Sequence, residues 1–93
     1  MNKVLFPKKD YVKELVRIFK SSKNSQKLVK TLSKYHEKDI AEAITLLTPA
    51  ERQHIYNVLD EHMIAEIFSY LDDAEKYLEE LSLEKAARVV SYM

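Results

Sequence analysis

Residues that favour helix starts recur at a regular twelve-residue spacing along most of this chain. The side chain of such a residue accepts a hydrogen bond from a backbone N–H in the first helical turn. The strongest signal is Thr48-Pro49-Ala50-Glu51, where Thr48 caps, Pro49 fills a position that needs no N–H, and Glu51 completes a capping box. The pattern predicts helices that begin near Asn24, His36, Thr48, Asp60, Asp72 and Ser82, with Asp60 and Asp72 assigned to capping.

The composition also favours helices. The chain has no glycine and two prolines among its 93 residues. Tight β-hairpin turns need positive φ angles, which glycine supplies at low cost, so a chain without glycine is poorly suited to hairpins. Apolar residues recur at i, i+3, i+4 and i+7, the period of an amphipathic helix. One such stripe contains Ile64, Ile67, Phe68 and Leu71. We therefore expect an all-α fold.

A longer repeat of 24 residues is superimposed on these stripes. Ile40-Ala41-Glu42 recurs as Ile64-Ala65-Glu66 and, loosely, as Ala86-Ala87-Arg88. An apolar residue follows each of these motifs at a similar distance: Leu47, Leu71 and Met93. Helices of about ten residues are marginal alone, so each apolar stripe needs a neighbouring helix. The sequence predicts a small α-solenoid, a right-handed superhelical stack of short antiparallel helices, with Leu71 in its core.

The net charge is zero at pH 7, but the charge is divided unequally along the chain. Residues 1–34 contain ten Lys and Arg against two acids, a net charge of +8, and residues 35–93 contain five against thirteen, a net charge of −8. We interpret residues 1–35 as basic N-terminal helices and residues 36–93 as a repeated region of the same domain. Lysines outnumber arginines and spread over two helices, which argues against nucleic-acid binding. We expect a solvated basic face that lies toward anionic lipid in a membrane-bound parent.

Several classes of function are disfavoured. The chain has no cysteine, which removes disulfides, thiolate metal sites and cysteine nucleophiles. No apolar run is long enough to span a membrane, and no signal-peptide pattern opens the chain, so we expect a cytoplasmic location. The three histidines are isolated, and a glycine-flanked nucleophile turn is impossible, so we expect no enzyme activity. The six tyrosines are expected at the edge of the core with their hydroxyls in water.

Some carboxylates have no predicted capping role and could bind a metal. Glu66 lies roughly 150° around its helix from the apolar stripe, at about 100° per residue, and Glu42 occupies the same place one repeat earlier. Oxygen donors suit Mg²⁺, which commonly keeps most of its waters and takes one or two carboxylates. The candidate ligands are Glu66, with Glu42 as the alternative, and then Asp73, Glu79 and Glu80. The other interpretation is a solvated acidic face.

The segment from His36 to Met93 resembles the cytosolic N-terminal domain of the MgtE-type magnesium transporters. The resemblance rests on the order of four short motifs, none of them diagnostic alone: Asp39-Ile40-Ala41-Glu42, Thr48-Pro49-Ala50-Glu51-Arg52, Ile64-Ala65-Glu66-Ile67 and Ala86-Ala87-Arg88-Val89-Val90. It implies a regulatory domain at the cytoplasmic face of the membrane, in a parent protein that is a homodimer. The domain would dock on CBS domains of the same parent chain when Mg²⁺ binds between them. The resemblance also implies that Glu66 stands at an interface metal site, weakly bound by this fragment alone. An acidic motif that usually follows the position of Met93 is absent, so the resemblance implies truncation at the C-terminus.

A second resemblance offers a different class of function. The flagellar motor switch protein FliG uses similar stacked short helices as a protein-interaction scaffold. The charged torque-generating helix of that protein has no counterpart here, so the scaffold is the alternative to the magnesium-sensing domain.

Overall fold

Short helices follow one another through the whole of the chain that the structure describes. The computed structural model describes residues 10–93; the first nine residues of the predicted basic segment lie outside this range. The described residues form helices only, as predicted: α1 (Tyr11–Ser21), α2 (Ser25–Leu32), α3 (Glu37–Thr45), α4 (Pro49–Val58), α5 (Glu61–Phe68), α6 (Ala74–Leu78) and α7 (Leu83–Ser91).

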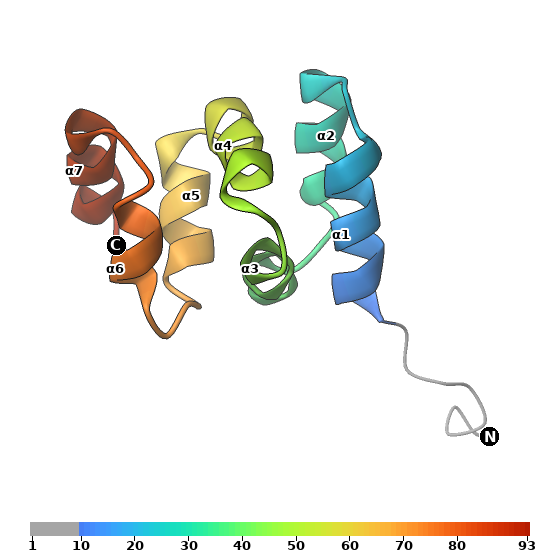
Figure 1. Cartoon of the computed structure of the whole chain (residues 1–93), viewed down its shortest axis with the longest axis horizontal. Helices are drawn as coiled ribbons and strands as arrows, with labels where there is room; N and C mark the ends of the chain where they lie inside the picture. The colour runs from blue at the N-terminus through green and yellow to red at the C-terminus, as the bar shows by residue number, and fades with distance from the viewer. Residues whose placement is uncertain (1–9) are drawn as a thin grey trace.

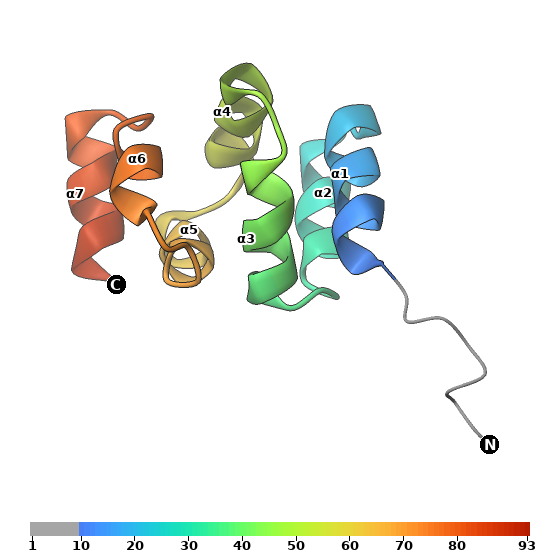
Figure 2. The same ribbon diagram turned by 60° about the horizontal axis from the view of Figure 1, so that its bottom comes forward.

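The helices succeed one another along a molecule that measures 51 × 28 × 21 Å. The α1–α2 pair lies at one end and the α6–α7 pair at the other, in both views of the ribbon (Figures 1 and 2). Alternate helices are in contact, because α1 packs on α3, α3 on α5 and α5 on α7. This arrangement agrees with a two-helix repeat, and the handedness of a superhelix stays a prediction.

Side-chain caps explain where most of these helices begin. Asn24, Asp60 and Ser82 each accept a hydrogen bond from the backbone N–H three residues later. Thr48 and Glu51 form the predicted capping box, with Glu51 Oε1 2.9 Å from the Thr48 nitrogen. The Nδ1 atom of His36 accepts from the Lys38 N–H. These five predicted helix starts are confirmed.

The predicted cap at Asp72 is wrong. Helix α6 begins after Asp73, which makes no side-chain cap hydrogen bond. The backbone of Asp73 has φ −120° and ψ 59°, outside the extended conformation of the other central caps, so its carboxylate is not directed at the first helical turn. The short α6 begins instead with a tight backbone bond from the Lys76 N–H to the Asp73 carbonyl.

One continuous core joins the basic helices to the rest of the molecule. Leu15 and Phe19 of α1 and Leu28 and Leu32 of α2 are buried in the same cluster as the apolar residues of α3 to α7. Helices α1 and α2 therefore pack as part of the same folded body.

The predicted core positions agree with the structure except near α7 and at Leu71. Leu47 is buried, but Leu71 is only partly buried against the core and Met93 is 51% exposed. The end of the repeat accounts for the exposure near α7. Ala41 and Ala65 are buried beneath the next helix of the series, whereas Ala87, at the corresponding place in α7, is exposed because no described helix lies beyond it.

Candidate functional site

The candidate metal ligands do not converge on a single site. Glu66 of α5 and Glu42 of α3 are exposed, as the helical periodicity predicted, and so are Asp73 and Glu79. Within residues 10–93, no three acidic or histidine side chains come close enough together to hold a metal ion. The described chain therefore lacks a complete metal centre, although an exposed carboxylate can still supply one ligand of a hydrated Mg²⁺.

Two of the candidates, Glu42 and Asp73, share a hollow with a further carboxylate, Asp72. A surface hollow of about 330 Å³ is lined by Lys38, Glu42, Thr45, Tyr70, Leu71, Asp72 and Asp73. The fold thus brings Glu42 and Asp73 to one place, although they are far apart in the sequence. Lys38 lies in the same hollow, and its positive charge opposes the binding of a cation there.

Glu80 differs from the other candidates because its carboxylate is already engaged. Its oxygens accept hydrogen bonds from Arg52 Nε at 2.9 Å and Arg52 Nη2 at 2.7 Å, and from the Tyr56 hydroxyl at 2.9 Å. The Arg52 side chain is only 8% exposed. A metal at Glu80 would have to displace these donors, so Glu80 is the least suited of the candidate ligands.

The electrostatics of this cluster follow from these contacts. Hydrogen bonds from Arg52, and then from Tyr56, lower the pKa of Glu80 below its ordinary value, against the opposing effect of burial. Hydrogen bonding to Glu80 raises the pKa of Arg52. Burial, followed by the hydrogen bond to Glu80, raises the pKa of Tyr56. At neutral pH the cluster therefore holds a carboxylate, a guanidinium and a neutral phenol.

The same cluster ties together distant parts of the chain. Arg52 Nη1 donates to the Leu47 carbonyl at 2.5 Å, and the guanidinium lies over the ring of Tyr77, 5.1 Å from its centroid. Gln53 donates its side-chain amide to the Glu80 carbonyl at 2.8 Å. Helix α4, the turn before it and the end of α6 are thus held by one polar network.

The sequence pattern did not predict this network. The prediction that tyrosine hydroxyls reach water is wrong for Tyr56, which is buried and donates to Glu80. A signal was nevertheless present, since Arg52 occupies the first place of an apolar stripe that continues with Ile55, Tyr56 and Leu59. A charged residue on such a stripe is buried and needs a partner of opposite charge.

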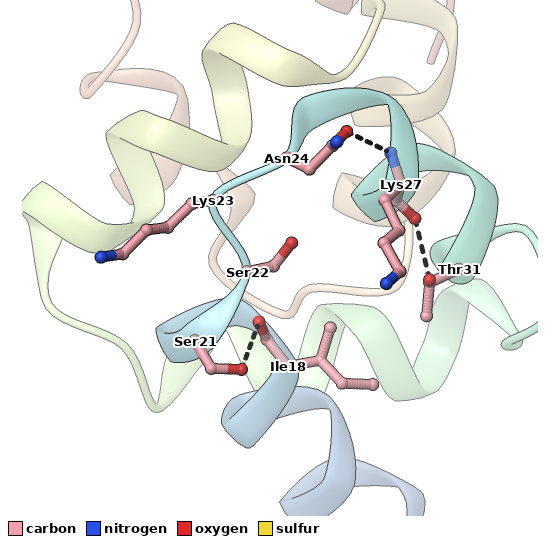
Figure 3. A pocket seen from close by; sticks show the side chains of 7 residues that line it. All are labelled: Ile18, Ser21, Ser22, Lys23, Asn24, Lys27 and Thr31. Atoms are coloured by element: carbon pink, nitrogen blue, oxygen red, sulfur yellow. Dashed lines mark hydrogen bonds between the residues drawn. The ribbon is translucent and has the colours of Figure 1, made fainter.

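A second hollow lies where α1 turns into α2. It has a volume of about 500 Å³ and is lined by Ile18, Ser21, Ser22, Lys23, Asn24, Lys27 and Thr31. Figure 3 shows Lys23 and Lys27 extending in different directions from its rim, with the Ser22 hydroxyl between the two helices. Ser21 and Thr31 donate their hydroxyls to backbone carbonyls of their own helices. No carboxylate lines this hollow, so its surroundings are basic.

The fold and these surfaces define a structural class of protein. The described residues form an all-α stack of short helices with exposed charged faces, and none of them forms a metal-ligand cluster. No described helix is both long and apolar enough to cross a membrane. Such a molecule belongs to the class of all-α domains built from stacked short helices.

The comparisons with known proteins agree with this class. The chain belongs to the family of the MgtE intracellular N domain, whose family model matches residues 35–93. This family is an intracellular domain of the MgtE-type magnesium transporters, which confirms the resemblance described above. The matched part begins just before α3 and extends through α7, so α1 and α2 lie outside it. No curated protein and no solved structure matches the chain.

Proposed function

We propose that this chain is the Mg²⁺-sensing regulatory domain of a magnesium transporter at the cytoplasmic face of the membrane. In this proposal it docks on CBS domains of the same homodimeric parent chain at high Mg²⁺ and separates from them at low Mg²⁺. The observation that carries the proposal is the family match over residues 35–93. Nothing in the comparisons favours the FliG-type scaffold.

The exposed carboxylates support the proposal of a metal ion that is bound between this chain and a partner. The described chain has no complete set of ligands, and Mg²⁺ keeps most of its waters while taking one or two carboxylates. A hydrated ion between Glu66 and an acidic group of the partner would draw the two surfaces together, and its loss would leave like charges facing each other. We assign Glu66 as the principal ligand of this chain and Glu42 as the alternative.

The isolated chain should therefore bind Mg²⁺ weakly. One carboxylate with a hydrated ion gives little affinity, so we expect binding in the range of ~1 mM or weaker, with strong sensitivity to salt. A Mg²⁺ titration followed by amide chemical shifts measures this affinity directly. Shifts centred on α5 would agree with Glu66, and shifts centred on α3 and the start of α6 would indicate the hollow of Glu42 and Asp73.

The parent protein offers the sharper test, with two matched variants. Limited proteolysis across a Mg²⁺ series reports whether the link between this domain and its partner is protected. Glu66→Ala should lose the protection at high Mg²⁺ and raise transport activity there, whereas Glu42→Ala should behave like the wild type. The reverse result would move the metal site one repeat toward the N-terminus. If both variants kept full Mg²⁺-dependent protection, neither glutamate would be a ligand and the acidic surface would be a solvated face.

A further inference from the structure

Helix α2 carries a row of lysines on the side opposite its buried residues. Leu28 and Leu32 are buried in the core, whereas Lys27, Lys30 and Lys34 are exposed. At about 100° per residue, Lys27 and Lys30 fall about 60° apart and lie roughly 150° from the two leucines, and Lys34 follows in the turn after α2. Ser33 continues the helical conformation beyond the end of α2, which keeps Lys34 close to the row. We call these three lysines, with Lys23 at the rim of the hollow before α2, the lysine face.

No described carboxylate forms an ion pair with the lysine face, although Lys34 shares a hollow with Asp39. Residues 15–36 contain six basic residues and no carboxylate. Among residues 10–93, none of the four lysines of this face takes part in an ion pair. Lys20 of α1 is different, because its ammonium group lies 4.0 Å from the Glu51 carboxylate. The lysine face therefore has positive charge that no described ion pair neutralises.

The hollow between α1 and α2 adds polar groups at one end of this face. Lys23 and Lys27 stand at its rim, and Ser22 and Asn24 also line it (Figure 3). The Asn24 side-chain oxygen is occupied as the cap of α2, since it accepts from the Lys27 N–H at 2.9 Å. The lysine side chains are the main attraction for an anion, and the hollow supplies room beside them.

We propose that the lysine face binds the surface of a lipid bilayer that contains anionic headgroups. Clustered lysines on one side of a helix are attracted to such a surface over about a Debye length, and each well-placed lysine contributes separately. Lysine is suited to this role because a compact, hydrated ammonium on a flexible stem needs no fixed partner geometry. Helix α2 lies at one end of the molecule and α6 at the other, so the carboxylates just before and after α6, Asp72, Asp73, Glu79 and Glu80, are kept away from a bilayer at α2 (Figure 1).

The observations favour a bilayer over a nucleic acid. The lysine face contains no arginine for bidentate contacts and no aromatic ring for base stacking, both of which are common at nucleic-acid interfaces. The nearest aromatic residue in the sequence, Tyr35, donates its hydroxyl to Glu14. The inference is independent of the proposed magnesium function, because α2 lies outside the matched part of the chain and uses none of the candidate metal ligands.

Vesicle co-sedimentation of the full chain tests the proposal. The vesicles contain phosphatidylcholine alone, or phosphatidylcholine with phosphatidylserine, at about 0.15 M and about 1 M salt, where the Debye lengths are about 8 and 3 Å. The Lys27→Ala/Lys30→Ala variant should lose roughly 25-fold in partitioning to the anionic vesicles, or about fivefold per lysine. The control Lys13→Ala/Lys38→Ala removes the same charge from exposed lysines on α1 and α3 and should change partitioning less than about twofold.

The expected result is binding that requires phosphatidylserine, disappears at high salt and depends on Lys27 and Lys30 but not on the control pair. Equal binding to neutral vesicles would overturn the proposal, and so would equal losses for the two double variants, which would indicate a simple effect of net charge. Binding of duplex DNA is measured as the alternative to binding of vesicles. Tighter binding to DNA than to vesicles at the same salt, with the same dependence on Lys27 and Lys30, would assign the lysine face to nucleic acid.

Discussion

The buried ion pair makes a sharp prediction about two adjacent glutamates. Glu79→Ala and Glu80→Ala remove the same side chain from neighbouring positions, and only Glu80 contacts Arg52. We expect Glu80→Ala to destabilise the fold strongly and Glu79→Ala to have almost no effect. The comparison is matched in residue type, in charge and in local secondary structure.

The expected magnitude follows from what Arg52 retains. Without Glu80, the guanidinium keeps its donation to the Leu47 carbonyl and its position over the Tyr77 ring, but its Nε and Nη2 atoms lose their acceptor. Removing one partner of a buried pair typically costs about 3–5 kcal/mol. The Glu80 side chain is 20% exposed, so water can reach part of the vacated site and the cost should lie near ~3 kcal/mol. An exposed site such as Glu79 should cost less than ~0.5 kcal/mol.

Urea denaturation followed by far-ultraviolet circular dichroism measures both variants. A loss of ~3 kcal/mol corresponds to a fall of roughly 12–24 °C in melting temperature for a domain of this size. A third variant, Arg52→Leu/Glu80→Leu, replaces both charges with apolar groups and should recover much of the lost stability, because no unpaired charge then remains buried. Similar losses for Glu79→Ala and Glu80→Ala would refute the reasoning, and a double variant less stable than Glu80→Ala would show that the cost does not come from the stranded guanidinium.

Three further predictions concern pH, helix capping and the core. The folded state lowers the pKa of Glu80 from its ordinary value of 4.5. The stability difference between the wild type and Glu80→Ala should therefore be complete above about pH 4.5 and should shrink as the pH falls through the lowered pKa of Glu80 in the folded state. Urea denaturation at a series of pH values measures this difference. Thr48→Ala breaks a capping box and should cost about 1 kcal/mol, whereas Asp73→Ala removes no cap bond and should cost less than ~0.5 kcal/mol; equal losses in thermal melts would contradict the capping geometry. Ile64→Ala should cost about 3–4 kcal/mol, whereas Leu71→Ala, at a partly buried site, should cost about 1–2 kcal/mol, and the reverse order in urea denaturation would show that the core is misplaced.

The sequence by itself determined the helical class, most helix starts and the family. A cap involves a side chain and a backbone N–H at most three residues apart, so five of the six predicted starts could be found without tertiary information. The prediction at Asp72 fails because α6 begins after Asp73 without any side-chain cap bond, and a helix of five residues has too few positions to show a periodicity. Exposure of Glu66 and Glu42 followed from helical periodicity alone.

Only the tertiary structure decided which charges are used within the fold. Arg52 and Glu80 lie 28 residues apart in sequence, and nothing near Glu80 distinguishes it from the neighbouring Glu79. The packing of α4 against the end of α6 brings the two charges together in a site where solvent is largely excluded. The lysines of α2 were equally visible in the sequence, but the absence of acidic partners among the described residues is a property of the packed molecule. Pairing of this kind depends on distances between separate helices, which a pattern along a single helix does not contain.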